Sequence, residues 1–219
     1  ALRLARRRNK GTFLVATGCY VQRAPLEIEQ LGGIDLAVDN TNKDNLVERI
    51  LSMRRQQPTG EGLLKVEHNL PQPGRRKRAT VRIQKGCNQV CAYCIVPKVR
   101  GRERSILPEA IVSNISELAD GGYKEVVLTG TELGSYGFDL SGMDLTGLLR
   151  RILAETTIER IRVSSLQPYD ISPDLVDLWS NPRLCPHFHM PLQSGSDKIL
   201  KSMRRRYTSQ EYLSAIKYV

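Results

Sequence analysis

Short apolar runs alternate with amphipathic segments along most of this 219-residue chain. The strand-like runs, in which apolar residues are consecutive or alternate with polar ones, lie at residues 12–17, 34–38, 79–86, 125–130, 160–165 and 187–192. The helical segments, in which apolar residues recur three or four positions apart, lie at residues 44–53, 108–119, 144–153, 172–179 and 208–219. Strands that alternate with helices pair in parallel through right-handed crossovers. The pattern predicts an α/β fold, and the β/α units after residue 79 are too few to close a barrel.

Local signals support several helix boundaries. Asp144 stands where an N-cap is expected, and Gly121-Gly122 follows the helix predicted at 108–119. Thr208 and Glu211 have the spacing of a capping box.

Residues 54–78 break this rhythm and contain three prolines, three glycines and the basic cluster 75–78. We expect an interdomain linker, whose basic cluster is either a solvated charge run or a nucleic-acid contact. The linker separates residues 1–53, the end of a small α/β domain, from a core domain at 79–219. The abrupt basic start and the end within a helix predict a chain truncated at both termini.

The composition is basic, with a net charge of +10 and a pI near 9.6. A polyanion is therefore a natural partner, although solubility alone explains part of the charge. No stretch approaches the roughly 18 consecutive apolar residues of a membrane span, and the start ALRLARRRNK lacks the apolar segment of a secretory signal. These features predict a cytoplasmic protein without a membrane partner.

Three of the five cysteines, Cys87, Cys91 and Cys94, lie close together directly after a predicted strand. This spacing favours metal or cluster ligation over disulfides, and α/β sheets carry their sites at the carboxyl ends of their strands. A structural zinc or a closed [4Fe–4S] site takes four protein ligands. Three thiolates leave one metal position open for another ligand. The alternative is that the cysteines pack as small apolar residues.

The stretch KGCNQVCAYC resembles the cluster-binding signature of the radical S-adenosylmethionine (SAM) enzymes, including an aromatic residue, Tyr93, before the last cysteine. This resemblance implies a partial (β/α) barrel and a [4Fe–4S] cluster on Cys87, Cys91 and Cys94. It further implies that SAM chelates the open iron and is cleaved to a 5′-deoxyadenosyl radical.

Four segments resemble, in order, those of the methylthiotransferases, which insert sulfur and a methyl group into tRNA adenosines or a ribosomal protein. They are GCNQVCAYCIVPKVRGRERS, VVLTGTELGSYG, RVSSLQP and HFHMPLQSGSDKILKSMRRRYT. GRERS and LGSYG look closest to the branch that methylthiolates N6-threonylcarbamoyladenosine next to the tRNA anticodon. Isopentenyladenosine tRNA and a ribosomal protein are the alternative substrates. The implied partners are tRNA and an electron donor such as flavodoxin or ferredoxin, and the implied state is a monomer.

The stretch VATGCYVQRAP resembles the segment that carries the third ligand of a second [4Fe–4S] cluster in this family's N-terminal domain. The resemblance identifies Cys19 as that ligand, although a lone cysteine after a strand is more often a packing residue. The first two family cysteines do not occur in this sequence, so its ligand set for the second cluster is incomplete.

Loops rich in glycine and small polar residues follow three predicted strands, at 129–137, 164–168 and 191–196. Such loops let backbone groups approach a nucleoside closely. By resemblance they contact or border SAM, and the residues identified for this role are Glu132, Ser165, Gln193 and Ser194.

Other residues near these loops carry less specific signals. Cys185 is expected to pack, while His187 and His189 alternate along a predicted strand and form either a polar wall of the site or satisfied core histidines. Arginine and lysine side chains suit a cofactor carboxylate, the tRNA backbone or only solvent; they are Lys98, Arg100, Arg102, Arg104 and Arg204 to Arg206. The candidates for stacking a flipped base are Tyr20, Tyr136 and Tyr169.

A rival from another class is a non-catalytic zinc-binding nucleic-acid module. The three-ligand count and the β/α surroundings of the cysteines disfavour it.

Overall fold

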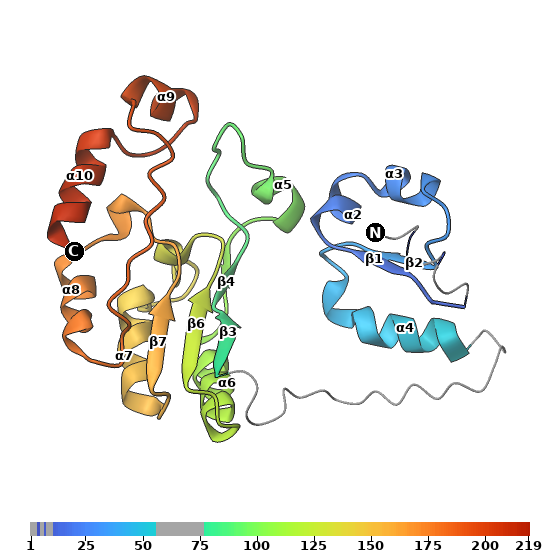
Figure 1. Cartoon of the computed structure of the whole chain (residues 1–219), viewed down its shortest axis with the longest axis horizontal. Coiled ribbons are helices and arrows are strands. Elements are labelled where there is room, and N and C mark those ends of the chain that lie inside the picture. Colours follow the sequence, from blue (N-terminus) through green and yellow to red (C-terminus); the bar gives the residue numbers. More distant parts are fainter. Residues whose placement is uncertain (1–3, 5–6, 8–10, 56–76) are drawn as a thin grey trace. The chain divides into compact units, whose positions relative to one another are not determined.

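The computed structural model describes residues 4, 7, 11–55 and 77–219. The chain divides into two compact units, residues 1–67 with 98–101 and residues 68–97 with 102–219 (Figure 1). Nearly all of the predicted linker at 54–78 lies outside the described residues, so the domain boundaries stay a prediction.

The first unit contains a two-stranded parallel sheet of β1 (Val15–Thr17) and β2 (Leu36–Val38). Its helical elements are α2 (Cys19–Arg23), α3 (Pro25–Gln30), η1 (Lys43–Asn45) and α4 (Leu46–Arg55). Its small core is formed by Ala16, Val21 and Ile28, with Ile34 packed against it. The unit is α/β, as predicted, although both strands are shorter than the apolar runs and α2 and α3 were not predicted.

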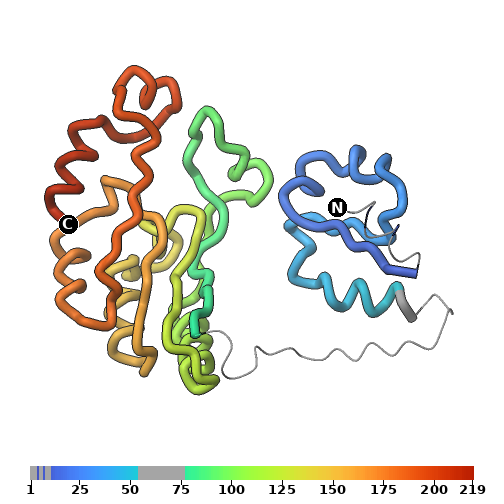
Figure 2. The backbone as a smooth tube through the Cα atoms, viewed as in Figure 1, coloured from blue at the N-terminus to red at the C-terminus, as the bar shows by residue number. Residues whose placement is uncertain are grey.

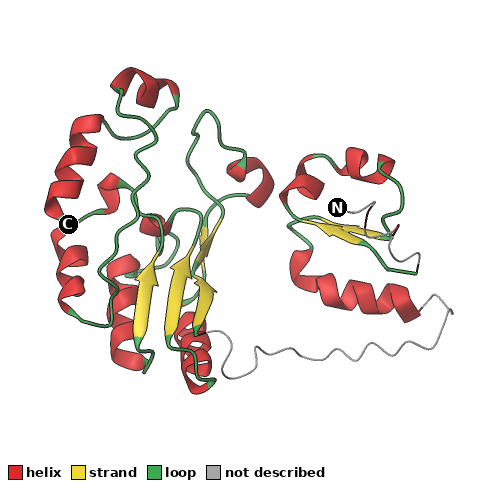
Figure 3. Cartoon of the chain, viewed as in Figure 1, coloured by secondary structure: helices red, strands yellow, loops and turns green. Residues whose placement is uncertain are grey.

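The second unit is built on three parallel strands, β3 (Arg78–Arg82), β6 (Glu125–Thr129) and β7 (Arg160–Val163), in the order β3-β6-β7. The strands lie side by side and point the same way (Figure 3). Helices α6 (Pro108–Asp120) and α7 (Leu145–Glu155) connect them and pack on each other. The described strands form an open sheet, which confirms the predicted parallel α/β arrangement without a closed barrel.

Apolar side chains from the strands and crossover helices make one large core in this unit. Its fully buried members include Ile83, Ile111, Ile115, Leu128, Leu148, Leu149, Ile152 and Ile161. These are the positions that the strand runs and helical stripes predicted to face inward. Burial of this continuous apolar surface is the main favourable contribution to folding here.

The predicted helix-start signals are present as hydrogen bonds. Asp144 Oδ1 accepts from the backbone N–H of Gly147 at 2.7 Å and caps α7. Thr208 and Glu211 form a reciprocal capping box at the start of α10 (Ser209–Tyr218). Ser172 caps the short helix α8 (Pro173–Val176), which continues into η4 (Asp177–Ser180).

The structure corrects two strand predictions. The run at 79–86 is divided, because residues after β3 leave its ladder and form β4 (Gln84–Lys85), which pairs antiparallel with β5 (Arg104–Ser105). The run at 187–192 is not a strand and makes only an isolated bridge from His189 to Ser165. Pro186 precedes this run and Pro191 lies within it, and a proline has no N–H to donate to a ladder.

Four further short elements were not predicted. Helix α5 (Val96–Arg100) lies between β4 and β5, and α9 (Asp197–Ser202) precedes α10. The 3-10 turns η2 (Leu133–Ser135) and η3 (Pro168–Asp170) follow β6 and β7. All four are only three to six residues long, too short to show a helical hydrophobic period.

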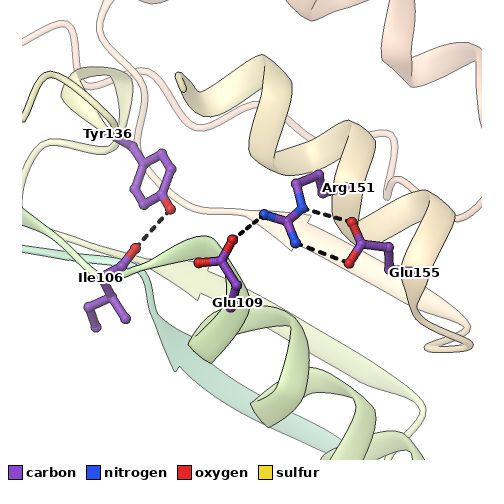
Figure 4. A network of polar contacts seen from close by, with 5 residues as sticks. All are labelled: Ile106, Glu109, Tyr136, Arg151 and Glu155. Atoms are coloured by element: carbon purple, nitrogen blue, oxygen red, sulfur yellow. Dashed lines mark hydrogen bonds and ion pairs between the residues drawn. The ribbon is translucent and has the colours of Figure 1, made fainter. Parts of the chain in front are cut away.

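Polar contacts join α6 to α7 on their solvent side (Figure 4). Arg151 of α7 donates to Glu109 of α6 at 2.7 Å and to Glu155 one turn further along α7 at 2.7 Å. Nearby, the Tyr136 hydroxyl donates to the carbonyl of Ile106 at 2.8 Å. The ion pairs are largely exposed and contribute little, whereas the tyrosine bond satisfies a buried hydroxyl.

Glu125 forms an ion-pair cluster at the amino edge of the sheet. Its side chain is 2% exposed and accepts from Arg78 of β3 at 2.7 Å and from Arg160 and Arg162 of β7 at 2.8 and 3.1 Å. Burial opposes ionisation, but hydrogen bonds from Arg162 and Arg78 outweigh it and lower the pKa of Glu125. The carboxylate of the central strand therefore ties both neighbouring strands to it.

We predict that Glu125→Gln lowers the free energy of unfolding at neutral pH by about 1–3 kcal/mol, because a charge-assisted acceptor is lost. A depressed folded-state pKa stabilises the protein above the unfolded carboxyl's pKa and ceases to do so as the pH falls through the folded value. The difference between wild type and variant should thus shrink in acid. Chemical denaturation at neutral and acidic pH measures it.

The matched control is Glu159→Gln, which removes an exposed carboxylate paired with the exposed Lys124. Its effect should stay within about 0.5 kcal/mol, as for other surface pairs. Equal losses in the two variants would contradict the assigned role of Glu125.

Candidate functional site

The loops that follow β3, β6 and β7 all leave the carboxyl edge of the sheet. The cysteine loop, defined here as residues 86–103, is the green segment that extends beyond the sheet in Figure 2. The β4–β5 pairing closes its base. Its first residues adjoin the turn after β6, because the buried Gln84 side chain accepts from the backbone N–H groups of Thr131 and Glu132 at 2.8 and 3.1 Å.

All three cysteines of this loop carry free thiols. Cys87 is buried and accepts from the backbone N–H of Gln89 at 3.3 Å, while Cys91 and Cys94 are half-buried. The Cys94 N–H donates to the Cys91 carbonyl at 3.1 Å, so these two residues share a tight turn. Burial raises the pKa of the Cys87 thiol to about 11, and any metal bound there must displace its proton.

The residues after α9 contact the cysteine loop. The Ala92 N–H donates to the Met203 carbonyl at 3.0 Å. Arg205 donates from Nη1 to Cys91 Sγ at 3.5 Å and to the Tyr93 hydroxyl at 3.4 Å, and from Nη2 to Gln167 Oε1. Segments far apart in sequence therefore meet beside Cys91.

Glu132 occupies a buried position after β6. The Tyr169 hydroxyl donates to its Oε1 at 3.5 Å. Burial, together with the nearby charge of Asp170, raises the pKa of Glu132 to about 7. Burial also raises the pKa of Asp170 to about 6, although it accepts a hydrogen bond from the Gln167 N–H at 2.7 Å. This edge thus holds two carboxyl groups that titrate near neutral pH.

Gly134 is required by the close packing of this acidic region. A Cβ atom at Gly134 would lie 1.9 Å from Cγ of Asp170, well inside the contact distance of two carbons. The glycine-containing turn therefore lets η2 and η3 approach each other.

The other predicted cofactor residues lie on neighbouring loops. Ser165 follows β7, and its hydroxyl is hydrogen-bonded to His189 Nδ1 at 2.7 Å. Gln193 and Ser194 lie on the loop before α9, where Gln193 is exposed and has a left-handed φ of 65°. Glu132 and Ser165 thus follow adjacent strands, whereas the structure shows no hydrogen bond from Gln193 or Ser194 to either.

Cys185 and the two histidines have different surroundings. Cys185 is buried, and its carbonyl accepts from Trp179 Nε1 at 2.9 Å, which agrees with a packing role. Both His187 and His189 are exposed, so neither is a core histidine. Residues 187–192 do not form a strand, so strand alternation no longer implies that the two histidine side chains point to the same side.

Two of the three tyrosines named as candidates for stacking a flipped base are exposed. Tyr136 is 2% exposed and belongs to the core, so that prediction is wrong. Tyr169 is 43% exposed with the Arg206 guanidinium 5.4 Å from its ring centre, and Tyr20 is 50% exposed.

Most of the basic residues named from the sequence are exposed, namely Lys98, Arg100, Arg102, Arg104, Arg204 and Arg206. Arg205, the remaining basic residue named from the sequence, is half-buried.

Cys19 lies in the first unit at the start of α2. It is half-buried, and Asn40 Nδ2 donates to its Sγ at 3.7 Å. Only this cysteine occurs before residue 87 in the sequence.

Two observations fit an iron–sulfur group on the cysteine loop. Three thiols on one short loop are the donor set that such clusters use. The Nε of Arg205 is a buried donor with no acceptor among the described residues, and an anionic group beside Cys91 would supply one. In the described ranges, no three Cys, His, Asp or Glu side chains are arranged to hold a metal ion.

The sequence revealed the residues of this site to different extents, as Glu132, Gln84 and Arg205 illustrate. Glu132 was identified through its motif. Gln84 was missed, because it alternates with apolar residues like the other polar residues of the run at 79–86 and nothing in the sequence marks it as buried. Arg205 was named only as one of three consecutive arginines, because sequence does not distinguish an inward guanidinium from two exposed ones.

Comparison with known proteins places this site in context. The family model described as Radical SAM superfamily matches residues 81–219. The threonylcarbamoyladenosine tRNA methylthiotransferase of Aquifex aeolicus is 38% identical over 100% of this chain and 55% of its own length. The tRNA-2-methylthio-N(6)-dimethylallyladenosine synthase of Moorella thermoacetica is 39% identical over 95% of this chain and 49% of its own length. The chain therefore spans about half the length of these relatives, which confirm the resemblance to methylthiotransferases.

A solved structure supports the fold. The radical S-adenosylmethionine methyltransferase TsrM from Kitasatospora setae matches with a TM-score of 0.68 at 15% identity, over 97% of this chain and 49% of that one. Within the part of the chain that the structure describes, no helix is long and apolar enough to span a membrane. The match over residues 81–219, together with the three-cysteine loop at the carboxyl edge of a parallel sheet, shows that the chain belongs to the radical SAM superfamily.

Proposed function

We propose that this chain is part of a tRNA methylthiotransferase that holds a [4Fe–4S] cluster on Cys87, Cys91 and Cys94 and binds SAM beside it. The observation that carries the proposal is the supply of three free thiols, and not four, on a loop at the sheet's carboxyl edge. The vacant metal position is where the amino and carboxylate groups of SAM would bind. A cluster on these three cysteines would supply the electron that breaks a carbon–sulfur bond of SAM, which gives methionine and the 5′-deoxyadenosyl radical.

The surrounding residues suit the binding and orientation of SAM. The Glu132 carboxylate, when ionised, can accept a hydrogen bond from an N–H of the SAM amino group, and its burial strengthens that interaction. Ser165 borders the same edge with its hydroxyl fixed by His189. Gln193 and Ser194, on the loop before α9, would border SAM as well. These side chains would position the substrate carbon and exclude water, which dominate catalysis of this kind.

For the substrate we propose N6-threonylcarbamoyladenosine in tRNA. This assignment is supported by the GRERS and LGSYG motifs and by relatives named for that nucleoside in Aquifex aeolicus and Bacillus subtilis. The Moorella thermoacetica relative is equally similar and is named for dimethylallyladenosine, which is another name for isopentenyladenosine. Isopentenyladenosine is therefore the alternative substrate. Exposed arginines within and directly after the cysteine loop offer phosphate contacts, and Tyr169 offers a stacking surface.

We also propose that Cys19 ligates a second [4Fe–4S] cluster, which would hold the sulfur to be transferred. This part rests on the VATGCYVQRAP segment alone. An electron donor such as flavodoxin or ferredoxin, a monomeric state and a cytoplasmic location complete the proposal.

We predict that expression of the complete gene in a deletion strain restores 2-methylthio-N6-threonylcarbamoyladenosine in tRNA. Mass spectrometry of tRNA nucleosides measures the product. Restoration of the methylthiolated isopentenyladenosine would instead assign the alternative substrate. If neither nucleoside gains a methylthio group, tRNA methylthiolation is not the function.

Cys91→Ala should abolish formation of 5′-deoxyadenosine from SAM after anaerobic reconstitution with iron and sulfide, because two thiolates cannot hold the cluster. Chromatography of the nucleoside and measurement of bound iron and zinc test this. Cys185→Ala is the matched control, since it removes a cysteine outside the loop, and it should retain cleavage. Tight zinc without iron in the wild type would favour the zinc-module rival.

SAM affinity should weaken as the pH falls through about 7, because a Glu132 carboxyl group with a pKa of about 7 then loses the negative charge that accepts a hydrogen bond from the SAM amino group. Asp170 and Glu103 raise this pKa, while Arg205 and the Tyr169 hydroxyl lower it. Below pH 7 the dissociation constant should rise toward roughly tenfold per pH unit. Equilibrium dialysis of labelled SAM over this pH range measures it.

Two variants test the assignment to Glu132. Glu132→Gln should bind SAM weakly at every pH in this range. Asp170→Asn should move the transition to lower pH, since the neighbouring negative charge is gone. A pH dependence that survives unchanged in Glu132→Gln belongs to another group.

A further inference from the structure

The turn that ends α9 directs one arginine inward. The Arg205 N–H donates to the Leu200 carbonyl at 2.9 Å and the Arg204 N–H to the Lys201 carbonyl at 3.0 Å, which is the bond pair of a Schellman motif. Arg204 occupies the left-handed position of that motif with φ 56°, a conformation unfavourable for a residue with a Cβ. The turn exposes Arg204 and Arg206 and half-buries Arg205 between them.

The Arg205 guanidinium joins three separate segments of the second unit. Nη1 donates to Cys91 Sγ at 3.5 Å and to the Tyr93 hydroxyl at 3.4 Å, both in the cysteine loop. Nη2 donates to Gln167, just after β7. The guanidinium carbon lies 5.0 Å from the ring centre of Tyr207, which covers it by a cation–π contact.

These contacts bring a fixed positive charge to one thiol of the loop and to no other. The described residues show no arginine or lysine hydrogen bond to Cys87 or Cys94. Hydrogen bonds and nearby charge at a sulfur ligand are among the main determinants of a cluster's reduction potential. A cation stabilises the more negative, reduced form, so it makes reduction easier.

We infer that Arg205 is a positioning residue of the cluster site, which fixes the Cys91–Tyr93 turn to the end of β7 and raises the reduction potential of the cluster through Cys91. This inference rests on the proposed function, in that Cys91 must be a cluster ligand. Both Nη atoms of Arg205 donate to the chain itself, whereas its neighbours Arg204 and Arg206 are exposed and suit a phosphate contact.

Three variants separate the positioning effect of Arg205 from the effect of its charge. Arg205→Met removes the charge and the hydrogen bonds but keeps an unbranched apolar stem under Tyr207. Arg205→Lys keeps the charge without the planar fork that reaches Cys91, Tyr93 and Gln167 together. Arg204→Asn is the matched control, since it removes one positive charge from the same turn and asparagine tolerates the left-handed φ.

The first measurement is the midpoint potential of the anaerobically reconstituted cluster, from a redox titration followed by electron paramagnetic resonance. Arg205→Met should shift the midpoint to a more negative value, Arg205→Lys should shift it less, and Arg204→Asn should leave it unchanged. A midpoint in Arg205→Met equal to that of the wild type overturns the inference. An equal shift in Arg204→Asn also overturns it, because the effect is then one of net charge.

The second measurement is amide hydrogen exchange of the cluster-free protein. The peptide covering residues 86–94 should exchange about tenfold faster in Arg205→Met, as expected when a charge-assisted hydrogen bond is lost, while the core peptides of β6 keep wild-type rates. Unchanged exchange of the loop peptide overturns the positioning role. Faster exchange of every peptide also overturns it, because the variant is then generally destabilised.

The two measurements separate the inference from the proposed function. Failure of the wild-type protein to bind iron refutes the proposed function. If only Arg205→Met fails to bind a cluster, the exchange of its loop peptide decides the inference: faster exchange confined to that loop supports it, and a wild-type rate overturns it.

Discussion

The parallel pairing of β3, β6 and β7 is the constraint on which the rest of the second unit depends. Parallel neighbours can be joined only by connections that return to the starting edge, so α6 and α7 act as crossovers and all three carboxyl ends lie at one edge. The cysteine loop, the turn of Glu132 and the segment of Ser165 are brought together by that geometry. Their separation in sequence is bridged by the helices that also bury the sheet.

Both edges of this sheet bury a carboxyl group, with opposite consequences for its ionisation. At the amino edge three guanidinium groups reach Glu125 and lower its pKa. At the carboxyl edge the nearby Arg205 donates to Cys91, Tyr93 and Gln167, so the burial of Glu132 is not offset to the same extent and its pKa rises to about 7. The first arrangement holds the strands in register, and the second leaves a group that can respond to a charged ligand.

Much of the fold could be predicted from local sequence signals. Asp144, Thr208 and Glu211 were identified as helix caps and form those hydrogen bonds. The apolar run at 187–192 was misleading, since Pro186 and Pro191 leave the backbone unable to form a ladder there. Tyr136 was likewise named as a candidate for stacking a flipped base, and only its packing in the core excludes it from that role.

The sequence by itself determined the spacing of Cys87, Cys91 and Cys94, on which the proposed cluster chemistry rests, because that spacing is a local property of one loop and local spacing is what a short motif records. Only the tertiary structure decided which side chains surround that loop. Gln84 and Arg205 are an ordinary polar residue and one of three arginines in the sequence. Their roles arise from contacts with Glu132 and Cys91, which lie 48 and 114 positions away along the chain. Such contacts exist only after the sheet has brought its carboxyl ends together, so no local pattern encodes them.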